Sequence, residues 1–580
     1  MYSAALLSLL SVAHADAVPA GTEIADALHV DITPAGLDAM GSLVPGLAPE
    51  DLPVDGISEG YDGLFGECWL GGYEATVDGL LIGLDFDNIN ITPNTGYLDA
   101  EITIYVSVNS SAEPFSLYTE LECIPSDCDG WVEPFEVNAF TEIALDVVVD
   151  DDGTQRLDAT IGELTVDYAL TGDDVYLEDC PLGTVLDVFA FIGLDIVDLI
   201  LPAIGDALND AVGDFAPELE TTLEDAFSAA TIDQELEVQD STLRLAVRPG
   251  DVVIQPAGLR LTMAGLAEAA EVSDCIAEWD SGEFEAISSS SPSIGQPAEG
   301  IDPDHAANLM LSDEFGNQLM YALWQSGLLC YTVDEDLGFP IDTSLLGLLA
   351  GEAFNPLFPE ARPMVIQTRP QQAPKLEFAA ANDIGLVVDD LGLDFMAELD
   401  HRNARVLAIG LEVDGGLDVG FDDTTGQLAI AFDLDAGSFN PSVTSNDFVP
   451  ESTDTIEESF ASVFSGLVGG LLGDALSDIT FTVPGLEGIG ITGMQVESAG
   501  PEGDWLGAYM WLGEVSYAST GCSDGEGEGG GCGGGEDGGC TDAAGAGCEG
   551  GGCTAGPRSQ RRWGLLLFPL FVALLRRRED

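Results

Sequence analysis

The sequence predicts an α+β protein of two tandem domains, each a curved antiparallel sheet wrapped round a long amphipathic helix. Three observations lead to this prediction. Alternating apolar and polar residues mark half-buried antiparallel strands, and apolar residues at helical spacing mark helices. A stretch rich in Ser and Pro divides the chain. On each side of it the same elements follow in one order, namely helix, antiparallel strands, long helix and strands.

The first half opens with a short strand at residues 28–32 that leads into a helix. Thr33 suits the N-cap of that helix, and Pro34 suits its first position, where the missing N–H would have no partner in any case. The apolar residues that follow recur at helical spacing: Leu37, Met40 and Val44. Strand-like alternation then marks residues 75–91, 97–108, 142–149 and 156–170, with a turn at Asp150–Thr154.

A long helix pattern comes next, before strands return at residues 234–249 and 258–265. Its apolar positions are Ile192, Ile196, Leu199, Ala203, Leu208, Val212, Phe215, Leu219, Leu223 and Phe227. Within the stretch Phe191–Ile204 further apolar residues widen the apolar face: Leu194, Val197, Ile200, Leu201 and Ile204. Two interpretations stay open, because this helix could line an apolar groove or could be buried on most sides.

The second half repeats this plan. A strand runs into a helix capped by Ser312 or Asp313, and the apolar residues of that helix are Phe315, Leu319 and Leu323. Strands follow as far as a turn at Asp422–Gly426 and beyond it. The late helix has apolar residues at Ile456, Phe460, Val463, Leu467 and Leu471, and closing strands follow it. We therefore expect an N-terminal domain at 16–285, a linker at 286–300 and a C-terminal domain at 301–518.

The two ends of the chain predict export and retention. Residues 1–15 form an apolar run that ends in Ala13-His14-Ala15, the small-x-small pattern of a signal peptide cleavage site. Residues 519–553 form a flexible tether, with 16 Gly and 5 Cys among the 33 positions 521–553. Residues 554–580 follow, and their apolar run at 563–575 is shorter than the roughly 20 residues that span a bilayer.

The charge of the chain excludes one class of partner. The chain has 104 acidic and 15 basic residues, a net charge of −89. Residues 16–553 carry 9 basic and 102 acidic residues, so the processed chain has 9 − 102 = −93. Nucleic acid is excluded, because binding phosphates requires Lys and Arg. A saline habitat and a calcium-rich envelope surface are both open as reasons for the charge.

Several stretches resemble one known family, the bactericidal/permeability-increasing protein, lipopolysaccharide-binding protein and cholesteryl ester transfer protein group, which has the tubular lipid-binding (TULIP) fold. Val30–Met40 resembles the family's first strand and helix. Leu309–Leu329 resembles the opening of its second domain, and Leu345–Phe378 resembles the next helix and strand. The linker also lies where the family places its own, so the resemblance extends over nearly all of residues 28–518.

This resemblance implies a boomerang of two TULIP domains joined by a central sheet. It implies an apolar pocket in each domain for the acyl chains of a phospholipid or related lipid, and hence lipid binding or lipid transfer. The side chains expected to contact lipid are Phe191, Ile192, Ile196, Leu199, Ile200, Ala203, Phe460, Val463 and Leu467. The family's bactericidal members bind anionic lipopolysaccharide with a cationic tip, and the acidic surface here argues against such binding by charge.

The C-terminal end resembles the MYXO-CTERM sorting signal. Cys553 is followed by Thr-Ala-Gly, then by the short hydrophobic helix and by the cluster Arg576–Arg578. The resemblance implies export, processing near Cys553 and retention at the outer membrane or cell surface. A plain C-terminal membrane anchor is the alternative, and it leads to the same compartment.

The cysteines of the body suit an exported protein. Members of the lipid-binding family carry a disulfide from a strand to the long helix, but this long helix has no Cys. The N-terminal half has four cysteines, Cys68, Cys123, Cys128 and Cys180, which allow three pairings. We favour Cys123–Cys128 and Cys68–Cys180. Cys275 and Cys330 could join the linker region to the second domain.

One motif points to a different function. Gly56–Gly60 matches the G-x-S-x-G nucleophile elbow, with Ser58 as nucleophile, but the elbow needs a strand before it and a helix after it. Its flanks read as loops, and only His29, His305 and His401 remain as bases after signal removal. We expect no catalytic residue, cofactor or metal. Three hypotheses remain: a lipid-binding protein, which we prefer, a structural or adhesive envelope protein with filled pockets, and an esterase using Ser58.

Overall fold

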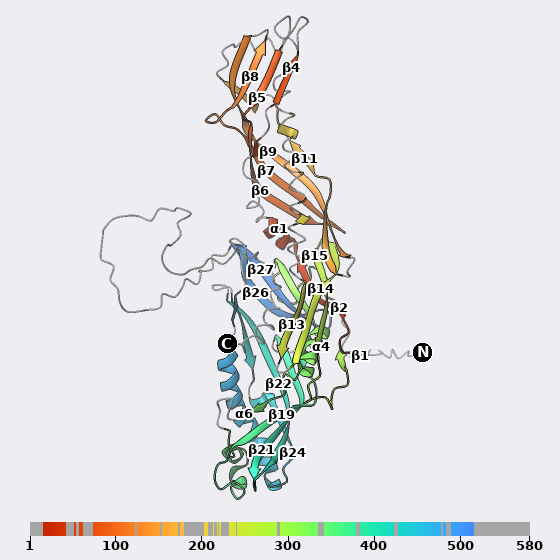
Figure 1. Cartoon of the computed structure of the whole chain (residues 1–580), viewed down its shortest axis with the longest axis vertical. Coiled ribbons are helices and arrows are strands. Elements are labelled where there is room, and N and C mark those ends of the chain that lie inside the picture. The colour runs from red at the N-terminus through yellow and green to blue at the C-terminus, as the bar shows by residue number, and fades with distance from the viewer. Residues whose placement is uncertain are drawn as a thin grey trace, which may run out of the picture.

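The computed structural model describes most of the chain between Asp16 and Glu514. The described ranges are 16–41, 52–53, 57–61, 73–121, 124–150, 154–171, 174–178, 202, 204–206, 213, 217, 220–221, 231–238, 241–286, 290–333, 341–378, 383–422, 427–434, 436–476, 480–482 and 489–514. Three large antiparallel sheets follow one another along the long axis of an elongated body (Figure 1). We call them the upper, central and lower sheets after their places in Figure 1.

The upper sheet is built round one very long strand, β9 (Ile124–Val149). Five strands pair with β9, and β7 (Leu98–Val108) is the longest of them. The other strands of this ten-stranded sheet are β3 (Leu52–Pro53), β4 (Ile57–Tyr61), β5 (Tyr73–Asp78), β6 (Leu81–Pro93), β8 (Phe115–Leu121), β10 (Gln155–Ile161), β11 (Thr165–Tyr168) and β12 (Val175–Glu178). The turn expected at Asp150–Thr154 joins β9 to β10, and Asp150 N–H donates to the Thr154 carbonyl at 2.9 Å.

The central sheet takes strands from both halves of the chain. Its seven strands run in the order β13 (Ile232–Val238), β14 (Ser241–Gln255), β15 (Gly258–Ala269), β2 (Ile24–Ile32), β17 (Ala307–Ser312), β27 (Trp505–Glu514) and β26 (Ile489–Ala499). The halves meet where β2 pairs with β17, with Val30 opposite Leu309. On their other sides Val30 lies opposite Leu261, and Leu309 lies opposite Ala508. Each half therefore brings its opening strand and a late strand to the junction in the same arrangement.

Each opening strand leads into a capped helix. Thr33 Oγ1 accepts from the Gly36 N–H at the start of α1 (Pro34–Gly41), at 3.3 Å. Ser312 Oγ accepts from the Phe315 N–H at the start of α4 (Asp313–Gln325), so Ser312 is the cap of the two that the sequence left open. The predicted apolar face of α4 is buried: Phe315, Leu319 and Leu323 are at most 6% exposed.

The lower sheet has eight strands and is covered by helices of the second half (Figure 1). Its strands are β18 (Thr332–Val333), β19 (Met364–Pro370), β20 (Lys375–Glu377), β21 (Ile384–Leu399), β22 (Arg402–Asp422), β23 (Gln427–Asp433), β24 (Phe439–Ser445) and β25 (Thr480–Thr482). The helices beside it are α5 (Ser344–Ala350), η4 (Gly351–Phe354), η5 (Ala436–Ser438), η6 (Pro450–Ser452) and α6 (Thr453–Leu476). The late helix predicted from the sequence is α6.

The segment between the halves is folded against the central sheet. Arg260 Nη1 donates to the Pro292 carbonyl at 2.6 Å, and the Ala298 N–H donates to the Tyr509 hydroxyl oxygen at 3.1 Å. Just before it, β1 (Asp16–Pro19) pairs with β16 (Glu283–Ala286). The architecture is sheet-rich and of the predicted α+β class. The division into tandem domains and the boomerang shape stay predictions. Within the described ranges, no helix combines the length and the apolarity needed to cross a membrane.

Candidate lipid-binding faces

The upper sheet has one apolar face at its centre, where β7 pairs with β9. Every second residue of β7 is buried, so Ile102, Ile104 and Val106 point to the same side. These three side chains are at most 2% exposed. The residues opposite the first two, Ala139 and Val137, are fully buried as well. We call this side of the upper sheet the inner face, and the opposite side the outer face.

The long helix predicted from the sequence meets the inner face at Ile204. The backbone is helical at residues 202, 204–206, 213, 217 and 220–221. Ile204 is fully buried and packs in the apolar cluster of the inner face. At Gly205 a Cβ atom would lie 2.5 Å from the Tyr168 hydroxyl oxygen, far inside van der Waals contact. Glycine at this position therefore lets the helix approach β11 closely.

Most residues expected to contact lipid in the first half lie outside the described residues. They are Phe191, Ile192, Ile196, Leu199, Ile200 and Ala203. Ile204 closes the same stretch and places the end of it against the inner face. A groove along the rest of the helix stays a prediction.

In the second half the predicted lipid-contacting residues lie on α6. Phe460 is fully buried, and its ring stacks on that of Phe464 with 4.1 Å between the ring centroids. Both rings belong to the apolar cluster between α5, α6 and the lower sheet, and Val463 packs against it while partly buried. The side chain of Leu467 lies outside the described residues. At Phe460 the helix is thus packed into a core.

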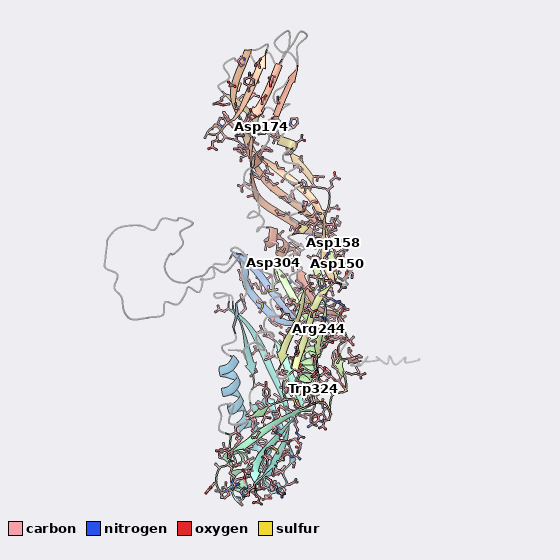
Figure 2. All side chains as sticks on the ribbon, in the orientation of Figure 1. Asp150, Asp158, Asp174, Arg244, Asp304 and Trp324 are labelled. Carbon is pink, nitrogen blue, oxygen red and sulfur yellow. A yellow bond between two sulfur atoms is a disulfide. The ribbon has the colours of Figure 1, made fainter. Side chains whose placement is uncertain are left out.

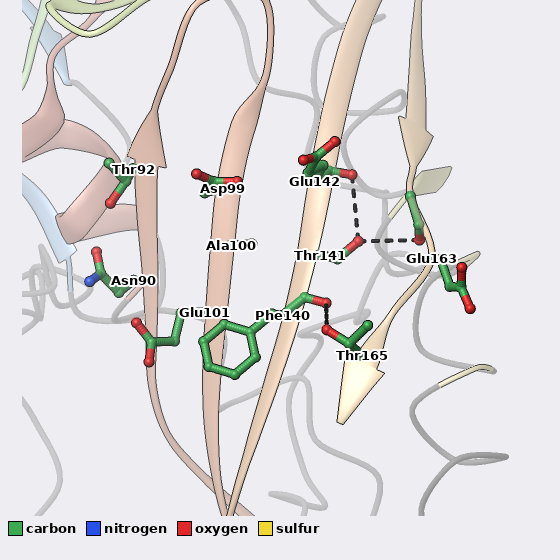
Figure 3. A pocket seen from close by; sticks show the side chains of 11 residues that line it. Asn90, Thr92, Asp99, Ala100, Glu101, Phe140, Thr141, Glu142, Glu163 and Thr165 are labelled. Carbon is green, nitrogen blue, oxygen red and sulfur yellow. Dashed lines mark hydrogen bonds between the residues drawn. The ribbon is translucent and has the colours of Figure 1, made fainter. Parts of the chain in front are cut away.

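A hollow of about 710 Å³ lies on the outer face of the upper sheet (Figure 3). Its lining comes mainly from two rows of side chains that cross β6, β7 and β9. The lining residues are Asn90, Thr92, Asp99, Ala100, Glu101, Phe140, Thr141, Glu142, Gly162, Glu163 and Thr165. Four carboxylates among them make this hollow unlike the apolar pocket that the sequence predicts.

Ser58 does not stand in the geometry of a nucleophile elbow. It lies in β4, opposite Thr76 of β5, and its hydroxyl oxygen accepts a hydrogen bond from Thr76 Oγ1 at 3.4 Å. The sequence predicts loops around Ser58, and this prediction is wrong at Ser58 itself, because pairing with β5 makes the region a strand. An elbow needs a sharp strand-to-helix turn, which a strand interior does not provide.

The structure contains one of the disulfides considered from the sequence. Cys275 and Cys330 are bonded, with 6.3 Å between their Cα atoms, and the bond joins the segment after β15 to the segment after α4. Cys128 is also disulfide-bonded. Its favoured partner Cys123 lies outside the described residues, as do Cys68, Cys180 and the sorting-signal residue Cys553. The pairings in the first half stay predictions.

The central sheet buries a polar cluster that the sequence analysis missed. Arg260 Nε and Nη2 donate to the two carboxylate oxygens of Asp31, both at 2.6 Å, and the two side chains are at most 8% exposed. The His29 ring, which is 1% exposed as a residue, stacks on Trp505 with 4.4 Å between centroids. Burial, with the Arg260 charge second, lowers the pKa of His29 to about 3. His29 is therefore neutral at physiological pH.

A signal for this cluster was present in the sequence. Arg260 is the one charged residue of the apolar run 258–265, and Asp31 interrupts an apolar strand in the same way. A lone charge in a strand that is apolar on both sides needs a buried partner of opposite sign. The first eight residues of β15 are all buried, which means that both faces of the central sheet are covered there.

Comparisons with known proteins add little to this description. No family model matches the chain, and a search of curated proteins finds no match. Thirteen solved chains match. Among them is the crystal structure of lipopolysaccharide binding protein, at 12% sequence identity and a TM-score of 0.46, covering 85% of this chain and 100% of that chain. A likeness at this sequence identity and TM-score carries no argument about fold or function. The fold is therefore described from the sheets of this chain alone.

Proposed function

We propose that the protein binds lipid and holds acyl chains against the inner face of the upper sheet, beside the helix that carries Ile204. The observation that carries the proposal is the composition of this face. Its buried side chains are Ile, Val, Leu, Phe and Ala, with the disulfide-bonded Cys128 and a few hydroxyl groups. Among the described residues, the buried charged side chains lie in or beside the central and lower sheets: Asp31, Arg260, Asp313 and Asp394. Apolar, largely pre-formed surfaces with few polar groups suit acyl chains.

The energetics of an acyl chain favour such a site. Each buried methylene contributes about 0.8 kcal/mol, so part of one chain offsets the cost of ordering it. The proposed ligand is a phospholipid or related acyl lipid. Lipopolysaccharide bound through its phosphates is disfavoured, because the chain carries a net charge of −89.

The wider proposal places this activity at the cell surface. It takes residues 1–15 as a signal peptide, Cys553 as the processing region and residues 563–575 as the hydrophobic helix of the sorting signal. The proposed fold is a pair of TULIP domains, and each would hold lipid. The presence of strands from both halves in the central sheet supports this arrangement. The proposal needs no catalytic residue.

Native mass spectrometry of the full-length chain, extracted under mild conditions, tests lipid binding directly. Bound lipid should appear as added mass, and Ile104→Trp on the inner face should remove most of it by filling volume. Overpacking costs about 1–3 kcal/mol, so the unfolding midpoint has to be measured beside the lipid content. Tyr105→Trp, one residue along on the outer face, is the matched control and should retain the lipid.

A second function is favoured by a specific observation. Ile204 and Phe460 are both fully buried against their sheets, as expected of an envelope protein whose grooves are filled by its own helices. A wild-type preparation that carries no lipid and takes up no fluorescent phospholipid would support this alternative and contradict lipid binding.

A further inference from the structure

A row of exposed aromatic rings marks the outer face of the upper sheet. Tyr105 is 45% exposed, Phe140 is 40% exposed and Tyr176 is 41% exposed. All three point away from the inner face: Tyr105 and Phe140 alternate with its buried residues on β7 and β9, and Tyr176 lies between Val175 and Leu177, which pack against its cluster. A bulge in β9 between Phe135 and Val132 brings Trp131, the partner of Tyr176, to the outer face as well. Exposed aromatic rings gathered on one face are typical of interaction surfaces.

The rings are held in place by their neighbours. Tyr176 and Trp131 stack with 5.5 Å between centroids and 7° between ring planes. The Tyr176 hydroxyl donates to Glu133 Oε2 at 3.1 Å. Further along β9, Asn138 Nδ2 donates to Glu136 Oε1 at 3.1 Å. This part of the outer face is therefore ordered before any partner binds, which lowers the entropy cost of binding.

The hollow described above lies at one end of this row and contains Phe140 (Figure 3). Asp99 and Glu142, two of its four carboxylates, lie directly opposite each other on neighbouring strands. Like charges in that position repel, so a cation between them is stabilising. Of the eleven described residues that line the hollow, none is basic. The hollow thus combines an exposed ring with uncompensated negative charge.

We propose that the outer face of the upper sheet docks a basic polypeptide segment of a partner protein. Arginine or lysine side chains of the segment would enter the hollow against Phe140, and others would lie over Tyr105 and the Trp131–Tyr176 pair. The two ends of the row, Phe140 and Trp131, are nine residues apart on β9, and one bulge lies between them, which corresponds to roughly 25–30 Å. An extended segment of about nine residues spans that length.

Charge complementarity favours a basic polypeptide segment over a neutral glycan or an anionic ligand. A guanidinium group gains from both the ring faces and the carboxylates. A neutral glycan could stack on the rings but would leave the opposed carboxylates uncompensated, and an anionic ligand would be repelled. The proposed site is separate from the inner face, so it stands or falls independently of lipid binding.

The test uses a fluorescent oligoarginine peptide and the full-length chain, with binding followed by anisotropy. Because the whole molecule is acidic, the informative substitutions are those that leave the charge unchanged. The triple variant Tyr105→Ser/Phe140→Ser/Tyr176→Ser should bind the peptide about tenfold more weakly, and each single substitution about twofold more weakly. Tyr331→Ser and Phe448→Ser remove rings of 38% and 40% exposure elsewhere and should leave binding unchanged.

The charge of the hollow is tested separately. Glu101→Gln/Glu142→Gln should weaken peptide binding and reduce its salt dependence more than Asp454→Asn/Glu458→Gln, a pair of the same charge on α6. Unfolding midpoints of all variants are compared with wild type, since exposed substitutions should leave them unchanged. If the triple variant binds oligoarginine as wild type does, bulk charge alone explains binding and the proposal is wrong. Neutral dextran that binds wild type but not the triple variant would also overturn it, in favour of a glycan surface.

Discussion

The central and upper sheets differ in what they bury. The central sheet buries an ion pair, Asp31 with Arg260, and the two imidazoles of His29 and His305. At its centre both faces are covered, one of them by the segment that contains Pro292. The inner face of the upper sheet buries apolar side chains and a few hydroxyl groups, and its outer face is acidic and aromatic.

This difference separates a joint from a binding surface. A buried charge tolerates few neighbours other than its partner, so the central sheet is suited to fixing the two halves against each other. An apolar face without charges tolerates exchange of one apolar neighbour for another, including an acyl chain. We therefore infer that the central sheet holds the two halves together, and the ligand binding that we propose falls to the upper sheet. The following predictions test that inference.

The largest change in the free energy of unfolding is expected from breaking the Asp31–Arg260 ion pair of the central sheet. Arg260→Ala leaves the Asp31 carboxylate buried without its partner, and loss of one member of a buried pair costs about 3–5 kcal/mol. The free energy of unfolding from urea titration measures it. Replacing both residues, as in Asp31→Leu/Arg260→Met, should recover much of the loss. If Arg260→Ala costs under about 1 kcal/mol, the pair does not hold the joint together.

Arg156 gives the matched control for that experiment. It pairs with Asp150 and Asp158, which Figure 2 shows close to each other, and all three side chains are 34–48% exposed. Exposed pairs contribute about 0–1 kcal/mol, so Arg156→Ala should change the free energy of unfolding by no more than that.

A substitution on the inner face should lower the free energy of unfolding by less, on average, than Arg260→Ala does. Ile104→Ala removes buried methyl groups and should lower the free energy of unfolding by about 2–5 kcal/mol, at the upper end only if the cavity cannot collapse. Tyr105→Ser, on the outer face of the same strand, should stay within about 0.5 kcal/mol of wild type. Equal losses at both positions would mean that the two faces are not distinct.

The effect that is smallest at neutral pH is a pH dependence of stability at the joint. The pKa of His29 is lowered to about 3 in the folded chain, while an unfolded chain has a His pKa near 6.5. Between these values the unfolded state binds a proton that the folded state does not, so stability falls as the pH is lowered, by up to about 1.4 kcal/mol per pH unit. Acid titration of stability should be less steep in His29→Phe, which keeps the stacking on Trp505.

Asp313 changes the pH dependence of stability in the opposite direction to His29. Its contribution is the same in wild type and in His29→Phe, so it cancels when the two are compared. Burial, with the Asp504 charge second, raises the pKa of Asp313 to about 7. Its folded carboxyl keeps a proton that the unfolded one loses, so its contribution to stability grows as the pH falls. Both chains contain Asp313, and the difference between wild type and His29→Phe isolates the imidazole. Identical slopes in the two chains would contradict the assignment to His29.

Local signals in the sequence predicted much of the fold. The Thr33 and Ser312 caps and the alternation of β7 are properties of a few neighbouring residues, and the structure has all of them. The length of β9 was missed, because Pro125, Gly130 and Pro134 interrupt it and only residues 142–149 read as strand. Tertiary pairing with five other strands overrides those breakers.

The outer-face hollow was beyond sequence reasoning for another reason. Asn90, Glu101, Phe140 and Thr165 line it as one row across four strands, and only the register between those strands brings them together. The Arg260–Asp31 pair joins residues 229 positions apart, and it too forms only because strand register places the two residues opposite each other. The predicted lipid-contacting residues from Phe191 to Ala203 stay predictions, since none of them falls in the described residues.

The place of β2 in the middle of the central sheet has a consequence for synthesis. Gly258, the first residue of its neighbour β15, follows Ile32 by 258 − 32 = 226 residues. Its other neighbour, β17, emerges later still. At about 5–20 residues per second, a ribosome leaves β2 without either partner for on the order of 10–45 s. The strand that joins the two halves is among the first parts of the chain to be made and among the last to find its partners.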